Sequence, residues 1–281
     1  MTALKTLATG LAFPEGPRWH DGKLWFSDFY THKVQAVGLD GRIELKATVP
    51  QRPSGLGFLP DGSLLVVSML DRSVLRVRDG KASLYADLSS LAGGWCNDMI
   101  VDAKGRAYVG NFGYDKHKGE ALRNTCLIRI DPDGRTRVAA DDLTFPNGCA
   151  ITPDGKRMIV GETFANRLTS FDITPDGTLS NRRVFATVEG CNPDGICLDA
   201  EGAIWIADPH GKRMVRVFEG GRVDRQITFE EGRGAYACVL GGPDRKTLFI
   251  LTNSGSGPQM VDRRDGRIEY LSVPVAGAGI P

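Results

Sequence analysis

Four residues with oxygen-bearing side chains recur at one position of a repeated sequence pattern. Each lies eight residues before a turn glycine, or seven in the first copy: Glu15, Asn97, Asn147 and Asp194. Two carboxylates and two amide oxygens held together away from water repel one another unless a positive charge lies between them. A hard divalent cation binds such oxygens and keeps positions for water or substrate. The pattern predicts one divalent metal cation, with Ca²⁺ expected first and Mn²⁺, Zn²⁺, Mg²⁺ or Fe²⁺ as alternatives.

The pattern itself is an internal repeat. N-P-D-G-I-C-L-D-A-E-G-A-I-W-I-A-D from Asn192 has counterparts that start at Phe13, Arg52, Trp95 and Phe145, and a degenerate copy starts at Ala235. Each copy shows two short apolar segments joined by a tight turn, which is typical of a β-hairpin. The turn residues Gly22, Gly62, Gly105, Gly155, Gly202 and Arg245 are separated by steps of 40, 43, 50, 47 and 43 residues.

A repeat of this length is the period of a β-propeller blade. The sequence therefore predicts an all-β protein, a six-bladed β-propeller with four-stranded antiparallel blades, forming a single domain over residues 1–281. We expect Thr2 to Ala8 to supply an N-terminal strand that closes the last blade, because this pairing removes an exposed edge. The symmetry of the ring then places the four oxygen-bearing residues at one mouth of a central channel, with Ser54 and Ala237 at the two other positions.

Composition limits the partners and the location. The net charge of +1 provides no field that would attract nucleic acid or an anionic membrane. The N-terminus lacks a sustained apolar segment, so a cytoplasmic protein is expected, as a monomer or a weak homo-oligomer. The six cysteines occur singly in strand-like segments without zinc-finger spacing, which favours buried, reduced thiols.

At these motifs the chain resembles the SMP-30/gluconolactonase family, regucalcin-like six-bladed propellers that hydrolyse sugar lactones. The resemblance covers essentially the whole chain and rests on F-P-E-G-P at Phe13, N-D-M-I-V-D-A-K-G-R at Asn97, F-P-N-G at Phe145 and N-P-D-G at Asn192. It implies that Glu15, Asn147 and Asp194 bind the divalent metal. It also implies that Asn97 contacts substrate or completes the metal's ligand shell.

One departure from the family pattern concerns the substrate. Regucalcin-like members carry an arginine two residues before the N-D asparagine, whereas this chain has Trp95. An indole stacks on a ring or lines an apolar wall and does not grip a hydroxyl as a guanidinium does. A less hydroxylated lactone or an ester is therefore an alternative to a sugar lactone. It is equally expected that Trp95 only packs between blades and does not contact substrate.

Two other groups of residues are expected near the channel mouth. The substrate wall is expected to include Trp95, Asn97, Asn111 and Asn124, with the polar insertion 112–125 either a lid or a solvated loop. A second register at the ends of the second strands comprises Asp28, Asn111, Glu162, Asp208 and Asn253. These residues either cap strand ends or hold the metal ligands in place, and capping is favoured for all except Asn111 and Asp208.

The predicted function is a metal-dependent hydrolase that opens a lactone ring with metal-activated water. Asp194 is the candidate catalytic base, because a carboxylate can accept a proton from water and return it to the leaving ring oxygen. One rival is a phosphotriester or aryl-ester hydrolase at the same metal centre. A rival from another class is a non-enzymatic calcium-binding or interaction propeller.

Overall fold

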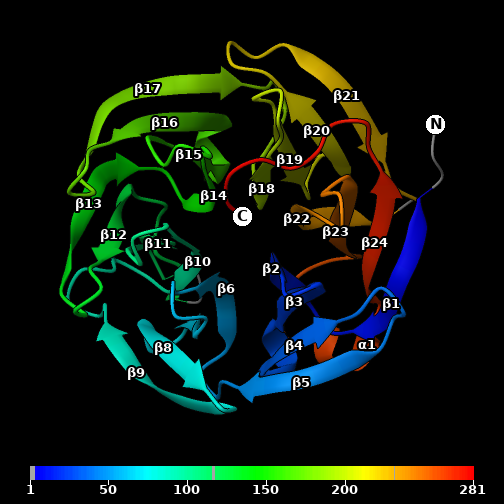
Figure 1. Ribbon diagram of the computed structural model, residues 1–281, viewed down its shortest axis with the longest axis horizontal. Helices are drawn as coiled ribbons and strands as arrows, with labels where there is room; N and C mark the ends of the chain where they lie inside the picture. The colour runs from blue at the N-terminus through cyan, green and yellow to red at the C-terminus, as the bar shows by residue number, and fades with distance from the viewer. Residues whose placement is uncertain (1–3, 116–117, 231) are drawn as a thin grey trace.

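The computed structural model describes residues 4–115, 118–230 and 232–281, and these form six sheets arranged around a common axis (Figure 1). Each sheet has four antiparallel strands, and in each the inner strand lies nearest the axis. This confirms the predicted six-bladed β-propeller. Among the described residues, no helix is both long and apolar enough to cross a membrane.

The strands follow the chain blade by blade from the axis outward. Blade one contains β2 (Pro14–His20), β3 (Lys23–Asp28), β4 (Lys33–Val37) and β5 (Ile43–Thr48). Blade two contains β6 (Pro53–Phe58), β7 (Leu64–Ser68), β8 (Ser73–Arg78) and β9 (Lys81–Asp87). Blade three contains β10 (Cys96–Val101), β11 (Ala107–Asn111), β12 (Thr125–Ile130) and β13 (Thr136–Leu143).

The remaining three blades complete the ring. Blade four contains β14 (Pro146–Ile151), β15 (Arg157–Glu162), β16 (Arg167–Ile173) and β17 (Leu179–Thr187). Blade five contains β18 (Ile196–Leu198), β19 (Ile204–Asp208), β20 (Arg213–Val217) and β21 (Val223–Thr228). Blade six contains β22 (Gly234–Gly241), β23 (Thr247–Asn253), β24 (Gly266–Ser272) and β1 (Lys5–Leu11), with the short helix α1 (Met260–Arg263) before β24.

The core lies between neighbouring blades. The second strands β7 and β19 are buried along their whole length, whereas β9 on the outside is mostly exposed. Leu65 of blade two and Met99 of blade three belong to one such cluster and are fully buried. Burial of both faces of these sheets against their neighbours fixes the ring, and with it the positions of the inner strands.

The N-terminal strand closes the ring as predicted. Strand β1 pairs antiparallel with β24, with Lys5 opposite Tyr270 and Leu11 opposite Gly266, and the two lie side by side in Figure 1. The strand begins at Lys5 and extends beyond the predicted end at Ala8. Thr2 and Ala3 lie outside the described residues.

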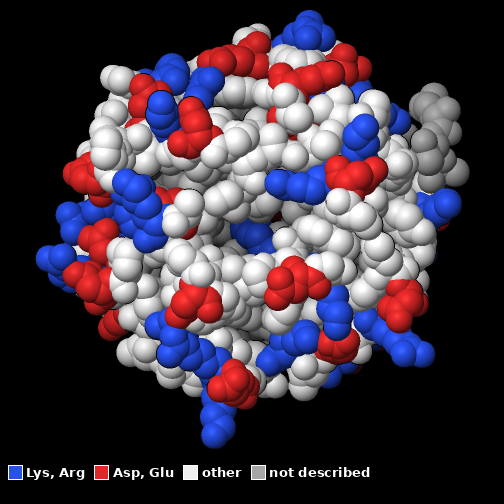
Figure 2. Space-filling model, in the orientation of Figure 1, with Lys and Arg blue, Asp and Glu red and all other residues white. Residues whose placement is uncertain are grey.

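The C-terminal tail runs toward the centre of the ring at the far ends of the inner strands (Figure 1). Ile280 bridges to Ile151 at the end of β14, and Gly277 bridges to Asp199 after β18. Arg245 donates to the carbonyls of Gly279 and Pro281 at 3.3 and 3.2 Å. The tail therefore lies at the opposite mouth from the starts of the inner strands. Figure 2 shows a hollow at the ring's centre with acidic and basic side chains interspersed around it.

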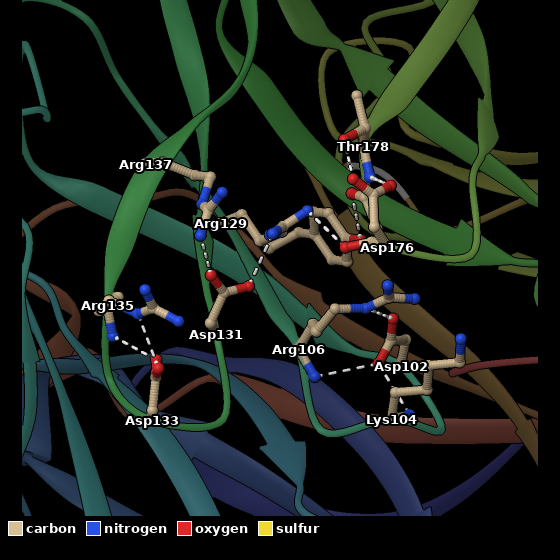
Figure 3. Close-up of polar contacts among 12 residues, drawn as sticks. Asp102, Lys104, Arg106, Arg129, Asp131, Asp133, Arg135, Arg137, Asp176 and Thr178 are labelled. Atoms are coloured by element: carbon tan, nitrogen blue, oxygen red, sulfur yellow. Dashed lines mark hydrogen bonds and ion pairs between the residues drawn. The ribbon is translucent and has the colours of Figure 1, made fainter.

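Ion pairs lie along the turns of blade three, on the side that faces blade four (Figure 3). Arg106 Nε contacts Asp102 Oδ2 at 2.6 Å, and Arg129 Nη2 contacts Asp131 Oδ1 at 2.8 Å. Arg129 Nη1 also donates to the backbone carbonyl of Asp176 in blade four at 3.0 Å. Because these arginines are almost fully buried, their carboxylate partners satisfy charges that water cannot reach.

Candidate metal centre

A local irregularity in the inner strands of blades one, three and four turns their ring residues toward the channel. The pairing of inner and second strands shifts register between Glu15 and Arg18, between Cys96 and Met99, and between Pro146 and Cys149. A bulge of this kind bends the strand and re-aims a side chain. In blade five, Asp194 precedes the ladder, and its backbone N–H donates to Ala207 O at 2.9 Å.

Glycine follows three of the four predicted metal ligands because the next blade leaves no space for a side chain. A Cβ on Gly148, after Asn147, would lie 2.5 Å from Ile196 N, and one on Gly195, after Asp194, would lie 2.6 Å from Ala237 Cα. The inner strands thus approach backbone to backbone, which draws the ring residues together. Blade three is different, because Asp98 follows Asn97.

Hydrogen bonds connect the ring from blade two to blade five. Ser54 Oγ donates to Asn97 Oδ1 at 3.2 Å, and Asn97 Nδ2 donates to Asn147 Oδ1 at 3.0 Å. Asn147 Nδ2 then donates to Thr163 Oγ1 at 3.1 Å, and Thr163 Oγ1 donates to Pro193 O at 2.7 Å. Thr163 therefore joins Asn147 to the segment that carries Asp194.

The ionised forms of the two carboxylates in the ring are disfavoured. Burial raises the pKa of Glu15 well above its usual range, and the charge of Asp194 raises it further. Burial also raises the pKa of Asp194 to about 8, and the charges of Asp98 and Asp208 add to this although a hydrogen bond from Asn147 opposes it. Burial is the main cause of both shifts, and the positive charge of Arg18 lowers the pKa of Glu15 only in part.

The donor set fits a hard divalent cation. Glu15, Asp194, Asn97 and Asn147 bring only oxygen ligands and amide groups, with no histidine or thiol among them. Within residues 4–115, 118–230 and 232–281, no three or more His, Cys, Asp and Glu residues cluster in a way that could hold a metal. A centre built from two carboxylates and neutral amide oxygens is consistent with that result and suits Ca²⁺ or Mg²⁺ better than a soft metal.

Sequence reasoning overlooked Asp98 and Arg18 beside this ring. Arg18 on β2 is 6% exposed, and its Nη2 lies 3.4 Å from Asp98 Oδ1 on β10. Arg18 also donates to Pro17 O at 2.7 Å and to Met99 O. The pair spans from blade one to blade three. Asp98 could have been noticed from the repeat, because glycine follows the three other predicted metal ligands.

The predicted wall residues lie in different surroundings. Trp95 is half-buried, and its ring centroid lies 6.3 Å from that of Phe112. Asn111 is fully buried and bonds to Cys126 O at 2.8 Å, to Gly113 N at 3.0 Å and to Thr125 Oγ1 at 2.7 Å. The Asn111 amide thus holds the ends of the insertion, and no described hydrogen bond links it to the ring.

Asn124 also lies apart from the ring. It is exposed, and its Nδ2 donates to Asp142 Oδ1 at 2.6 Å while its Oδ1 accepts from Thr144 Oγ1 at 2.8 Å. The insertion reaches the mouth through its first residues instead, because Phe112 stacks on Phe145 with a centroid distance of 4.5 Å. Its beginning is an aromatic wall beside the start of blade four.

The second register acts mainly on the backbone. Asp28 accepts from the N–H groups of Ala12 and Phe13, and Asn253 donates to Ala12 O. Glu162 accepts from Thr144 N at 2.8 Å. Asp208 accepts from the N–H of Asn192 at 3.2 Å, two residues before Asp194, and so helps to position that carboxylate. Capping therefore describes Asp28 and Asn253, whereas Glu162 also pairs with Arg167 at 2.8 Å and accepts from Thr169 Oγ1. Asp208 combines capping with support of the ring and also pairs with Arg213 at 2.9 Å.

Arg52 was also missed at the channel mouth. It lies two residues before Ser54, as Trp95 lies two residues before Asn97, so both residues directly precede an inner strand. The guanidinium carbon of Arg52 is 4.9 Å from the ring centroid of Tyr30 and 5.4 Å from that of Trp95. An arginine is thus present beside Trp95, supplied by the neighbouring blade, and the repeat register was the signal that could have found it.

The fold and the ring define a class of protein: a six-bladed propeller with an oxygen-lined polar site at the start of its inner strands. The chain belongs to the SMP-30/Gluconolactonase/LRE-like family, whose model matches residues 13–254. This confirms the family resemblance found in the sequence motifs.

Individual relatives agree with this assignment. A 6-deoxy-6-sulfogluconolactonase of Pseudomonas putida is 31% identical over 162 residues, which cover 56% of this chain and 53%, about half, of the relative. Regucalcin of Danio rerio is 26% identical over 251 residues, covering 85% of this chain and 82% of the relative. A gluconolactonase from Xanthomonas campestris superposes with a TM-score of 0.77 at 25% identity, covering 97% of this chain and 90% of that structure.

Proposed function

We propose that this protein is a metal-dependent lactonase that acts at the mouth formed by the starts of the inner strands. The observation that carries the proposal is the convergence of Glu15 and Asp194, two carboxylates with raised pKa values, on the linked amides of Asn97 and Asn147. The gluconolactonases among the relatives support the lactone as substrate class.

Glu15, Asn147 and Asp194 would hold the cation, and Asn97 would complete the shell or contact substrate. When bound, a divalent cation supplies positive charge that polarises an ester carbonyl and makes nearby water more acidic. Its charge also offsets the repulsion between the two carboxylates.

Asp194 performs the proton transfers in this proposal. Its carboxylate accepts a proton from the attacking water while the water oxygen bonds to the carbonyl carbon of the lactone. The bond between that carbon and the ring oxygen then breaks, and Asp194 returns the proton to the departing oxygen. Water and lactone become one hydroxy acid, and the carboxylate is regenerated. Asn97, fixed by Ser54 and Asn147, orients the substrate through its amide.

A panel of sugar lactones, aliphatic lactones, aryl esters and a phosphotriester tests the proposal. Each substrate is assayed after chelation and after addition of Ca²⁺, Mn²⁺, Zn²⁺, Mg²⁺ or Fe²⁺. We expect lactone hydrolysis that chelator abolishes and one or more cations restore. Faster hydrolysis of the phosphotriester or aryl ester would favour the rival hydrolase. Cation binding without turnover of any substrate would favour a binding protein.

A further inference from the structure

Arg52 occupies a built position at the substrate side of the ring. It immediately precedes strand β6, two residues before Ser54, which bonds to Asn97. Its backbone has φ of +68°, a left-handed conformation uncommon for a long side chain. Two hydrogen bonds fix it there, from Arg52 N to Val49 O at 3.1 Å and from Met69 N to Arg52 O at 2.9 Å.

The guanidinium of Arg52 is a half-buried cation without a partner of opposite charge. The rings of Tyr30 and Trp95 contact it, and its Nε is buried and makes no hydrogen bond. Within the part of the chain that the structure describes, no carboxylate forms an ion pair with Arg52. Burial lowers the pKa of Arg52, which is the effect expected of a charge removed from water without compensation.

Every fully buried arginine among the described residues pairs with a carboxylate, and half-buried Arg72 and Arg245 donate to backbone carbonyls, whereas the guanidinium of Arg52 has neither kind of partner there. Arg18 pairs with Asp98, Arg106 with Asp102, and Arg216 with Asp199 at 2.7 Å. Partly buried guanidinium groups are costly unless paired, and five N–H donors in a planar fork suit a two-oxygen anion. An anionic group of a bound ligand would supply the partner that Arg52 lacks.

Tyr30 adds a hydrogen-bond donor beside the guanidinium of Arg52. Tyr30 Oη accepts from Gly257 N at 2.9 Å, which leaves its own O–H to donate. Burial raises the pKa of Tyr30, so the phenol keeps that proton. A hydroxyl group needs acceptors as well as donors, whereas the oxygens of an anion need only donors. The chemistry around Arg52 therefore favours an anion over a sugar hydroxyl.

We propose that Arg52, supported by Tyr30 and Trp95, binds an anionic substituent of the substrate, such as a carboxylate or sulfonate on the lactone ring. This deepens the proposed lactonase function and rests on it for the reaction itself. Two residues of extended chain span about 7 Å, so a substituent of a small ring can reach Arg52 while its carbonyl lies at the oxygen-lined ring. Trp95 stands at the position where regucalcin-like members carry an arginine. In this proposal it contacts Arg52 of blade two, which supplies the guanidinium instead.

The test compares matched lactones that carry a carboxylate, a sulfonate or a neutral carboxamide at the same ring carbon. Wild type is expected to have a higher kcat/KM for the anionic lactones than for the carboxamide. In Arg52→Met that preference should fall by about 10- to 100-fold, the effect of losing a charge-assisted hydrogen bond. Arg52→Lys keeps the charge without the fork and should be intermediate. Arg78→Met is the control, because Arg78 is an exposed residue of the same blade that pairs with Asp61, and it should leave the preference unchanged.

Binding separates this inference from the lactonase proposal. Tetrahydrofuran-2-carboxylate, which cannot be hydrolysed at an ester, is titrated calorimetrically into metal-loaded wild type and Arg52→Met, after thermal melting shows that the variant is folded. Weaker binding to Arg52→Met supports the inference even if no lactone is turned over, which would overturn the lactonase proposal alone. If wild type hydrolyses lactones but Arg52→Met lowers kcat/KM equally for charged and neutral ones, Arg52 is a packing residue and the inference is wrong. A preference for only the carboxylate or only the sulfonate identifies which anion the site takes.

Discussion

Arg18 and Asp98 form an ion pair at 3.4 Å that links blade one to blade three beside the oxygen-lined ring. The two residues are 80 positions apart in the sequence. The negative charge of Asp98 contributes to the raised pKa values of Glu15 and Asp194, whereas Arg18 lowers that of Glu15. The pair is therefore part of the charge balance of the candidate metal centre as well as a contact between blades.

Replacing Asp98 by asparagine should destabilise the protein. Arg18 would keep its bonds to Pro17 O and Met99 O but lose its only described carboxylate partner. We expect a loss of about 1–3 kcal/mol in the free energy of unfolding, below the value for a buried charge left entirely alone. Urea denaturation of Asp98→Asn, Arg18→Met and the double variant measures this. A double variant whose loss equals the sum of the two single losses would show that the pair is not coupled.

Thr163 should act as a positioning residue for the cation. Its hydroxyl accepts from Asn147 and donates to Pro193 O, so Thr163→Val removes both bonds with little change in shape. Loss of such support typically weakens metal binding by about 10- to 100-fold. Calorimetric titration with Ca²⁺ measures the change. Thr163→Ser keeps the hydroxyl and should bind nearly as tightly as wild type, whereas equal weakening in both variants would point to lost packing of the methyl group.

The stability of the metal-free protein should depend on the protonation of Asp194. Its pKa in the folded state is about 8, above the ordinary value of 3.8, so the proton favours the folded state. The stabilisation is fully present below about pH 4 and is lost as the pH rises through about 8. In chelator, wild type should therefore lose stability relative to Asp194→Asn between about pH 5 and pH 9. Urea midpoints of the two proteins across this range decide the matter, and a constant difference between them contradicts the prediction.

The sequence predicted those features that the repeat determines. The steps between turn residues predicted six blades, and the shared register placed Glu15, Asn97, Asn147 and Asp194 on one ring. The closing strand followed from the edge that an incomplete last blade would expose. These inferences needed only the alternation of strands and turns, because symmetry converts a position in the repeat into a position in space.

The contacts that depend on individual side chains could not be predicted in this way. Register alone places Arg52 and Trp95 at neighbouring starts of inner strands, but it does not show that the guanidinium lies against the indole. Nothing in the sequence links Thr163 to Pro193, because that bond depends on how closely blades four and five approach. Asn124 illustrates the reverse case, since its side chain turns away to Asp142 although the insertion begins at the mouth.

Asp194→Asn should lose far more activity than added metal can restore. The substitution keeps the size and one oxygen ligand but removes the negative charge and the capacity to accept a proton. Loss of a positioned base typically lowers the rate about 10²–10⁴-fold, whereas a defect in binding alone is overcome by excess cation. Glu15→Gln is the matched control, because it also removes a ligand charge from a buried position on the ring but has no proposed role in proton transfer. Lactone hydrolysis by both variants is measured against rising Ca²⁺ until the rate is constant. If saturating cation restores both to the same extent, Asp194 is a ligand only, and the proton must be accepted by another group.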